Sequence, residues 1–234
     1  MNFYGKLIVS LALVSGIAAG LLSITYKTTA PAIEQREIED KANALESVFF
    51  LQKDASGLSL KREEIAEGVT ALYRADQPDK PAYYAVTGSA IGYNSGVPVS
   101  LMVGFTGPAA DAASLLAGYV DQAKLPDAGQ DGHYIVGFSV INSEETPGLG
   151  EKIKDVRPPY TWAQAVTGTK PAPDPDVATD FQKQFRGRLA DSLILKKNGG
   201  DLDAITASTI TSNGVISALR DASSRLQDAV ATKK

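Results

Sequence analysis

A run of twenty uncharged residues near the start of the chain limits its possible folds more than any other feature. The run reads LIVSLALVSGIAAGLLSITY, from Leu7 to Tyr26, with Lys6 before it and Lys27 after it. As an α-helix it would be roughly 30 Å long, which matches the thickness of the hydrocarbon core of a bilayer. We therefore expect residues 1–27 to form a short tail and a membrane-spanning anchor.

A cleaved signal peptide is the alternative interpretation of this run. The apolar part of a signal peptide usually has about 7–15 residues and ends at a site of small residues. This run is longer and no clear site of that kind follows it, so the sequence favours an anchor that is retained. Gly16 and Gly20 form a G-x-x-x-G pair, which would let another membrane helix approach closely.

The charges on either side of the run hardly determine its orientation. Lys6 and the amino terminus lie on one side, and Lys27 and Arg36 lie on the other, so the positive-inside rule favours neither side clearly. A short N-terminal tail makes a cytoplasmic N-terminus the default. We expect a single-pass protein of the inner (cytoplasmic) membrane whose C-terminal domain is on the periplasmic, extracytoplasmic side, which the lack of cysteine permits.

Composition excludes several kinds of chemistry. The chain has no cysteine and one histidine, His133, which rules out disulfides and iron–sulfur ligation and leaves almost nothing for a metal site or a Ser-His-Asp triad. Its net charge is −4 and it has no strongly basic block, which argues against a nucleic acid partner. We expect no metal site and no catalytic residue, so any redox chemistry requires an organic cofactor.

The rest of the chain indicates a stalk and one α+β domain. Residues 28–52 are predicted to form a stalk helix, because apolar residues recur near helical spacing on an otherwise charged segment. Residues 53–234 are predicted to form a mixed, largely antiparallel sheet packed with helices. Runs rich in Val, Ile, Tyr and Phe between turn residues predict strands at 69–75, 82–88, 97–105 and 133–141.

Further elements are predicted after and between these strands. The alanine-rich stretch 108–125 predicts a helix, 177–187 a short helix that stops at Gly187, and 191–197 (DSLILKK) a strand. The last segment predicts an amphipathic helix with apolar residues spaced 4, 3, 4 and 4 apart. Thr211 or Ser212 is the expected N-cap of that helix. Its apolar positions are Val215, Leu219, Ala222, Leu226 and Val230.

Two short motifs resemble those of FMN-binding domains. The segment DAITASTITSNGV, residues 203–215, resembles their flavinylation motif, Asp-x-x-Ser/Thr-Gly-Ala-Thr/Ser followed by a Thr-Ser pair. The segment EETPGLGEKI, residues 144–153, resembles their Glu-Thr-Pro-Gly-Leu-Gly signature, and residues 92–105 are similar to their Gly-Tyr-x-x-x-x-Pro strand. With the N-terminal anchor, this order resembles the G subunits of Rnf ion-translocating electron-transport complexes and their relatives, the C subunits of sodium-translocating NADH:quinone oxidoreductases.

The resemblance implies a covalent FMN. An extracytoplasmic, FAD-dependent flavin transferase would join the FMN phosphate to Thr209 as a threonyl phosphodiester, with Asp203 as the leading acid of the motif. Thr206 and Thr211 are the other hydroxyls of the expected site. Ser208 offers a competing hydroxyl, because it stands where alanine is usual, just as Ala207 stands where glycine is usual.

The second motif is expected to contact the flavin ring. Gly148 and Gly150 would allow close backbone approach, and Leu149 could cover one face of the ring. Thr146 could bond the polar edge, and Glu145 could orient the loop by accepting backbone N–H bonds. Two questions stay open here: whether Lys196 and Lys197 are phosphate partners or solvated lysines, and whether Tyr160 and Trp162 stack on the flavin, pack in the core or lie at the surface. His133, at the start of a predicted strand, is expected to be structural.

The expected function is that of a non-autonomous redox subunit without an active site of its own. Its flavin would relay electrons between other membrane and cytoplasmic subunits of an ion-translocating ferredoxin:NAD oxidoreductase. Three alternatives remain. The chain could be the quinone-reductase C subunit, an anchored FMN domain of another extracytoplasmic reductase, or a membrane-anchored scaffold in which the hydroxyl-rich segment is only a capped turn.

Overall fold

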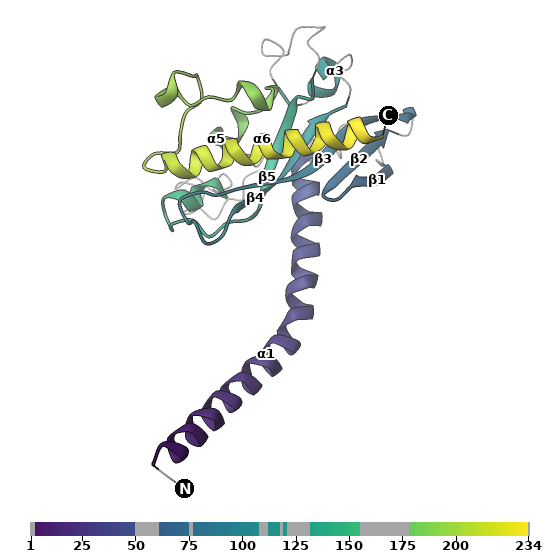
Figure 1. The fold of residues 1–234 in the computed structure, drawn as a ribbon. Helices are drawn as coiled ribbons and strands as arrows, with labels where there is room; N and C mark the ends of the chain where they lie inside the picture. The colour runs from purple at the N-terminus through teal and green to yellow at the C-terminus, as the bar shows by residue number, and fades with distance from the viewer. Residues whose placement is uncertain are drawn as a thin grey trace, which may run out of the picture. The chain divides into compact units, whose positions relative to one another are not determined.

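Figure 1 shows the computed structural model of the chain, which describes residues 3–49, 61–74, 77–107, 112–117, 119–120, 132–154 and 178–233. The chain divides into two compact units, Met1–Ala42 and Asn43–Lys234. The first unit is helical, and the second holds the sheet and the remaining helices.

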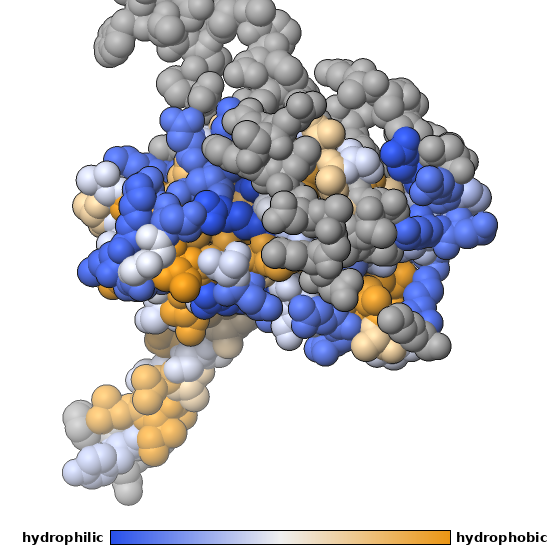
Figure 2. Space-filling model, turned by 90° about the horizontal axis from the view of Figure 1, so that it is seen from above, coloured by the Kyte–Doolittle hydropathy of each residue, from blue (hydrophilic) through white to orange (hydrophobic). Residues whose placement is uncertain are grey.

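One long helix, α1, covers Phe3–Val48 and includes the apolar run. Its segment Tyr4–Leu45 contains a window long and apolar enough to cross a membrane, and no side chain in that window is buried. The helix is continuous between residues 27 and 28 and contains Pro31, which lacks a backbone N–H. In Figure 2 the visible part of α1 is coloured mostly hydrophobic, as expected for a surface that faces lipid.

Several hydroxyls of α1, including those of its threonines, form hydrogen bonds within the helix itself. Thr25 donates to the carbonyl of Leu21 at 3.0 Å, and Thr29 donates to the carbonyl of Thr25 at 2.8 Å. A hydroxyl that bonds the preceding turn leaves no unpaired donor for the hydrocarbon. These threonines therefore do not prevent this part of α1 from lying in a membrane.

The second unit is built on a five-stranded antiparallel sheet with the strands in sequence order. The strands are β1 (Lys61–Ala66), β2 (Val69–Arg74), β3 (Gln77–Ala90), β4 (Val99–Thr106) and β5 (Ile135–Asn142). The four predicted strands are confirmed as β2 to β5. The sequence did not predict β1, because its residues KREEIA are mostly charged; charges of this kind suit an exposed edge strand.

The C-terminal helix α6, Thr209–Thr232, packs across the sheet and confirms the predicted amphipathic helix (Figure 1). Its residues Val215, Leu219 and Leu226 are fully buried against the sheet. Gly88 of β3 allows the close approach, since a Cβ at that position would lie 2.2 Å from the carbonyl oxygen of Ala218. The sheet therefore fixes the position of α6 and of its first turn.

The opposite face of the sheet is covered separately. Neighbouring residues of a strand point to opposite faces, so Tyr84 of β3 joins the α6 side and Tyr83 joins a second cluster. That cluster includes Val48, Phe49 and Leu116, from the C-terminal end of α1, the residue after it and the short helix α3 (Ala112–Leu116). α3 confirms the predicted helix in part; residues 121–125 lie outside the described residues.

The segment before α6 contains short helical turns. The helix α5, Asp180–Lys183, begins with a capping box formed by Thr179 and Gln182. It confirms the predicted helix at 177–187 in part, because residues 184–187 form turns and residue 177 lies outside the described residues. The 3₁₀ turns are η3 (Gly150–Ile153), η4 (Ala190–Ser192) and η5 (Lys196–Asn198).

The predicted strand at 191–197 is wrong, because η4 and η5 occupy much of it. Leu193 and Leu195 are buried while Ile194 is 43% exposed, which imitates the alternation of a strand. No ladder forms beside them, and Leu195 makes a single bridge with Leu202. Side-chain burial alternates here because this stretch runs along the surface of the core as short helical turns.

Candidate functional site

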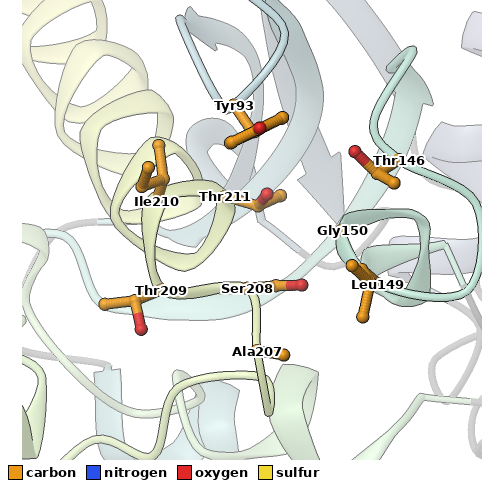
Figure 3. A pocket seen from close by; sticks show the side chains of 9 residues that line it. All are labelled: Tyr93, Thr146, Leu149, Gly150, Ala207, Ser208, Thr209, Ile210 and Thr211. Carbon is orange, nitrogen blue, oxygen red and sulfur yellow. The ribbon is translucent and has the colours of Figure 1, made fainter.

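A cavity of about 440 Å³ brings the two motifs together. Figure 3 shows its walls, which come from the loop after β3, the loop after β5 and the start of α6. Specific ligand sites usually enclose about 300–1,000 Å³, so this cavity can take a cofactor-sized molecule. The lining residues are Tyr93, Thr146, Leu149, Gly150, Ala207, Ser208, Thr209, Ile210 and Thr211.

A left-handed residue forms the turn into α6. Ala207 has φ +61° and is the only residue other than glycine with a positive φ in the described part of the chain. Left-handed backbone favours glycine, which explains why the flavinylation motif usually has glycine at this position. The turn is closed by Ser212, whose hydroxyl donates to the Ser208 carbonyl at 2.9 Å and accepts from the Ile205 N–H at 3.0 Å.

The predicted N-cap of α6 is wrong. The helix begins at Thr209 with Ser208 in the N-cap position, whereas Thr211 or Ser212 was expected. The Ser208 side chain makes no capping hydrogen bond. Thr211 and Ser212 instead lie at the start of the helix itself, and both are buried. The Thr211 hydroxyl donates to Glu145, and the Ser212 hydroxyl donates to the carbonyl of Ser208.

The two adjacent hydroxyls, those of Ser208 and Thr209, have different surroundings. Ser208 is 6% exposed, and its Oγ atom is buried without a hydrogen-bond partner among the described residues. Thr209 is partly exposed. Figure 3 shows the Ser208 hydroxyl directed to the side where Leu149 lies, while the Thr209 side chain points away from Leu149. Thr209 therefore offers the hydroxyl that a second protein can reach.

Glu145 lies behind the wall of the cavity. It is 5% exposed and accepts a hydrogen bond from the Thr211 hydroxyl at 2.6 Å. It also accepts backbone N–H bonds from Tyr93 and Asn94 at 3.2 and 3.4 Å. Glu145 thus accepts backbone bonds as expected, but the partners belong to the loop after β3 and not to its own loop.

Besides Glu145, three predicted site residues lie outside the lining. Asp203 is exposed and pairs with Lys196 Nζ at 2.7 Å, while its backbone N–H and carbonyl both bond the Gln184 side chain at 2.8 Å. Thr206 and Gly148 are exposed and line no wall of the cavity. Lys196 is thus an exposed lysine with an acidic partner.

A second ion pair lies at the start of the same loop. Arg188 holds both carboxylate oxygens of Asp201, at 3.0 and 2.5 Å. This hydrogen bonding lowers the pKa of Asp201 below its usual value. The outer side of the loop is therefore polar and charged, in contrast to the side that lines the cavity.

The sequence analysis missed three residues that line the cavity, and two residues that it considered lie outside the described structure. Tyr93, Ala207 and Ile210 line the cavity but were not predicted as site residues. Tyr93 stands in the Gly-Tyr-x-x-x-x-Pro stretch, so that similarity was the signal that could have found it. Tyr160 and Trp162 lie outside the described residues.

His133 has a structural position, as the sequence analysis expected. Its Nδ1 lies 2.8 Å from the carbonyl oxygen of Thr106, and its ring packs edge-on against Tyr84. These contacts hold the start of β5 against β4. His133 is not among the residues that line the cavity.

The fold and the site define the class of the protein. The model of the FMN-binding domain family matches residues 127–224. This match includes the loop after β5 and the whole segment from Asp203 to Thr211, which together supply eight of the nine lining residues. The chain therefore contains an FMN-binding domain, matched over residues 127–224.

Similar proteins identify the family within this class. The G subunit of an ion-translocating oxidoreductase complex from Yersinia pestis is 30% identical over 172 residues, 72% of this chain and 74% of the relative. The corresponding G subunit from Methanosarcina acetivorans is 26% identical over 227 residues, 93% of this chain and 91% of the relative. The chain belongs to the family of G subunits of Rnf-type ion-translocating oxidoreductase complexes.

A third relative carries a more specific name. It is the G subunit of the Na⁺-translocating ferredoxin:NAD⁺ oxidoreductase complex from Acetobacterium woodii, and it is 27% identical over 213 residues, 91% of this chain and 86% of the relative. The chain is accordingly a subunit of a membrane redox complex and carries a domain for FMN.

Proposed function

We propose that this chain is the electron-carrier subunit of an Rnf-type ferredoxin:NAD oxidoreductase, with FMN joined to Thr209 by a phosphodiester. The observation that carries this proposal is the difference between two neighbouring hydroxyls. Thr209 is partly exposed at the edge of the cavity, whereas the oxygen of Ser208 is buried. A covalent modification by another enzyme requires the accessible hydroxyl.

The residues of the cavity fit FMN. Leu149, Ile210 and Tyr93 supply apolar and aromatic surface for a planar ring, and all three are substantially exposed, at 41%, 56% and 65%. Thr146, Ser208 and Thr211 supply hydroxyls for its polar edge. The unpartnered Ser208 Oγ supports this fit further, since buried polar atoms almost always have a hydrogen-bond partner in a complete structure.

The position of Thr209 suits a phosphodiester. It is the first residue of α6, where backbone N–H groups without partners in the helix and the positive end of the helix dipole favour an anion. A threonine hydroxyl alone is a weak nucleophile, so its activation belongs to a partner, the FAD-dependent flavin transferase. This chain contributes the acceptor oxygen and the cradle for the product.

The relay role follows from what flavins do and from the exposure of the cavity. FMN, when bound, passes one or two electrons at a time, so it can link a partner that exchanges one electron with a partner that exchanges two. Leu149, Ile210 and Tyr93 remain substantially exposed at the cavity, so a bound ring would be close to the surface where partner proteins dock. The ferredoxin and NAD chemistry and the ion path are assigned to other subunits.

The tether has a purpose outside the cytoplasm. A flavin bound without a covalent link could escape from an extracytoplasmic domain into a compartment that holds little of it, and a tether removes that loss. We place α1 in the inner membrane with its N-terminus in the cytoplasm and the FMN-binding domain on the extracytoplasmic side.

Covalent attachment is tested by producing the full chain with and without the flavin transferase and examining a denaturing gel for flavin fluorescence. The proposal predicts a fluorescent band at the size of the chain only when the transferase is present. A chain that stays dark with the active transferase would overturn the covalent assignment. Recovery of the native chain from membranes together with a reductase, but without the other Rnf subunits, would overturn the assignment to this complex.

The side of the membrane can be tested cleanly because the natural chain has no cysteine. Lys197 is exposed on the FMN-binding domain and Tyr4 precedes the apolar run, so Lys197→Cys and Tyr4→Cys each give one thiol. A membrane-impermeant maleimide applied to cells with a permeabilised outer envelope should label only the Lys197→Cys chain. Labelling of only the Tyr4→Cys chain would reverse the orientation.

A further inference from the structure

Glu145 is a buried acidic residue that contacts three parts of the cavity wall without lining the cavity. Its carboxylate accepts one hydrogen bond from the first turn of α6, through Thr211, and two from the loop after β3, through Tyr93 and Asn94. Glu145 itself begins the loop 145–150, the third wall. One side chain thus joins all three segments that form the cavity.

The surrounding backbone is shaped around this carboxylate. A Cβ at Gly92 would lie 2.2 Å from Glu145 Oε1, and a Cβ at Gly150 would lie 2.7 Å from Glu145 Oε2. Gly214 of α6 also packs on Gly92, since a Cβ there would lie 3.0 Å from the Gly92 Cα atom. A side chain at Gly92 or Gly150 would displace the carboxylate from its present position, so glycine at both positions leaves room for it.

The hydrogen bonds around Glu145 all run in one direction. Each of its three partners donates and Glu145 only accepts, which is the pattern of an ionised carboxylate. Among the residues that the structure describes, no lysine or arginine forms an ion pair with it. The negative charge is held by backbone N–H groups and a hydroxyl, and no lysine or arginine in the described part of the chain pairs with it.

The bond from Thr211 also determines what the cavity offers to a ligand. Thr211 lines the cavity, and its single hydroxyl proton is donated to Glu145 at 2.6 Å. A hydroxyl whose proton is already used retains only its lone pairs. Thr211 therefore presents a hydrogen-bond acceptor, suited to an N–H group on the ring.

We infer that Glu145 is a positioning residue of the flavin site that locks the three cavity walls together, fixes Thr211 as an acceptor and makes the bound flavin harder to reduce. The last effect arises because an anion close to the ring opposes the arrival of electrons. This inference rests on the proposed function for the identity of the ligand. The locking of the walls is a property of the chain itself.

The locking is tested by hydrogen exchange on the full chain without flavin, in detergent, using Glu145→Gln and a matched control, Glu144→Gln. Both changes remove one carboxylate, but Glu144 is exposed and its side chain forms no ion pair in the described structure. We expect at least one of the Tyr93 and Asn94 amides to exchange roughly tenfold faster or more in Glu145→Gln alone, because glutamine keeps one acceptor oxygen and replaces the other with an NH₂ group that cannot accept. Equal exchange in the two variants would overturn the inference.

Thr211→Val provides a second route if Glu145→Gln does not fold. It keeps the carboxylate but removes the shortest of its three bonds, so exchange should rise in the first turn of α6. Thr211→Ser retains a hydroxyl and should restore the native exchange rates. Failure of Thr211→Ser to restore them would show that the hydroxyl is not the important group.

The effect on the flavin is tested by the midpoint potential of the covalently labelled chain. Glu145→Gln should move the potential to a more positive value, and Glu144→Gln should move it much less, because water screens its charge. Equal shifts in the two variants would overturn the electrostatic role. A native chain that carries no flavin would instead contradict the proposed function, and the exchange result would still stand.

Discussion

The two halves of the segment from Asp203 to Thr211 lie in different surroundings. Asp203 and Thr206 are exposed, and Asp203 is held by Lys196 and Gln184 on the outer side of the loop. Ser208, Thr209 and Thr211 line the cavity (Figure 3). Between the halves, the left-handed Ala207 turns the chain from the surface into α6.

In the proposed function, this difference separates recognition from retention. The flavin transferase reads the first half, which lies outside the cavity, and residues of the second half, which line the cavity, hold the product. A short motif that is continuous in sequence thus contributes both to the outer surface of the loop and to the wall of the cavity. Four substitutions test this distinction, and they follow in decreasing order of their effect.

Thr209→Val should abolish covalent flavin while leaving the fold intact, because it replaces one hydroxyl by a methyl group of similar size. Fluorescence of the chain on a denaturing gel after production with the transferase measures the effect. Thr232→Val is the matched control, since Thr232 is exposed at the far end of α6 and lies outside the cavity. Full labelling of Thr209→Val would place the acceptor elsewhere and remove the functional difference between the halves.

Asp203→Asn should slow labelling several-fold if the transferase reads the exposed acid. The control is Lys196→Met, which removes the ion pair but keeps the carboxylate, and which should label at nearly the native rate. The initial rate of flavin incorporation into the purified chain measures both. Equal slowing in the two variants would assign the effect to the shape of the loop and not to recognition of the acid.

Ala207→Gly should stabilise the unlabelled chain by about 1 kcal/mol, because a left-handed residue with a Cβ costs about 1–2 kcal/mol and part of this gain is lost to the greater freedom of unfolded glycine. Ala204→Gly is the control and should destabilise, since Ala204 does not have a positive φ. Thermal unfolding of the detergent-solubilised chains measures both. A loss of stability in Ala207→Gly would contradict a left-handed turn at this position.

Ser208→Ala should change stability least, with a gain of up to about 1 kcal/mol in the unlabelled chain, because it removes a buried hydroxyl that has no hydrogen-bond partner among the described residues. Labelling should remain complete, since this oxygen is not the acceptor. If the flavin forms a hydrogen bond with the Ser208 hydroxyl of the native chain, the gain in stability from Ser208→Ala should be smaller in the labelled chain. Reduced labelling of Ser208→Ala would show that the buried hydroxyl takes part in attachment.

Much of the fold could be predicted because its signals are local. β2 to β5 are rich in Val, Tyr and Phe between turn residues, and the apolar positions of α6 repeat at helical spacing. β1 could not be predicted in this way, because it is stabilised by pairing with β2 and has little buried surface of its own. The false strand at 191–197 has the opposite cause, since Leu193 and Leu195 alternate with Ile194 without any partner strand.

The site was predicted in part, for a similar reason. The two motifs identified six of the nine lining residues, because the resemblance marks residues by type and order. It could not show that Asp203 faces solvent or that Thr211 donates to Glu145, since both depend on how the loop after β3 meets α6. Contacts between segments distant in sequence require the folded chain.

The attachment of FMN to Thr209 underlies the whole proposal, and peptide mass spectrometry can locate it. The native chain is purified from membranes of cells that contain the transferase, and the peptide from Asp203 to Arg220 is fragmented. We predict an added mass of one FMN minus one water, located on Thr209. An unmodified peptide, or the same added mass on Ser208, would contradict this assignment.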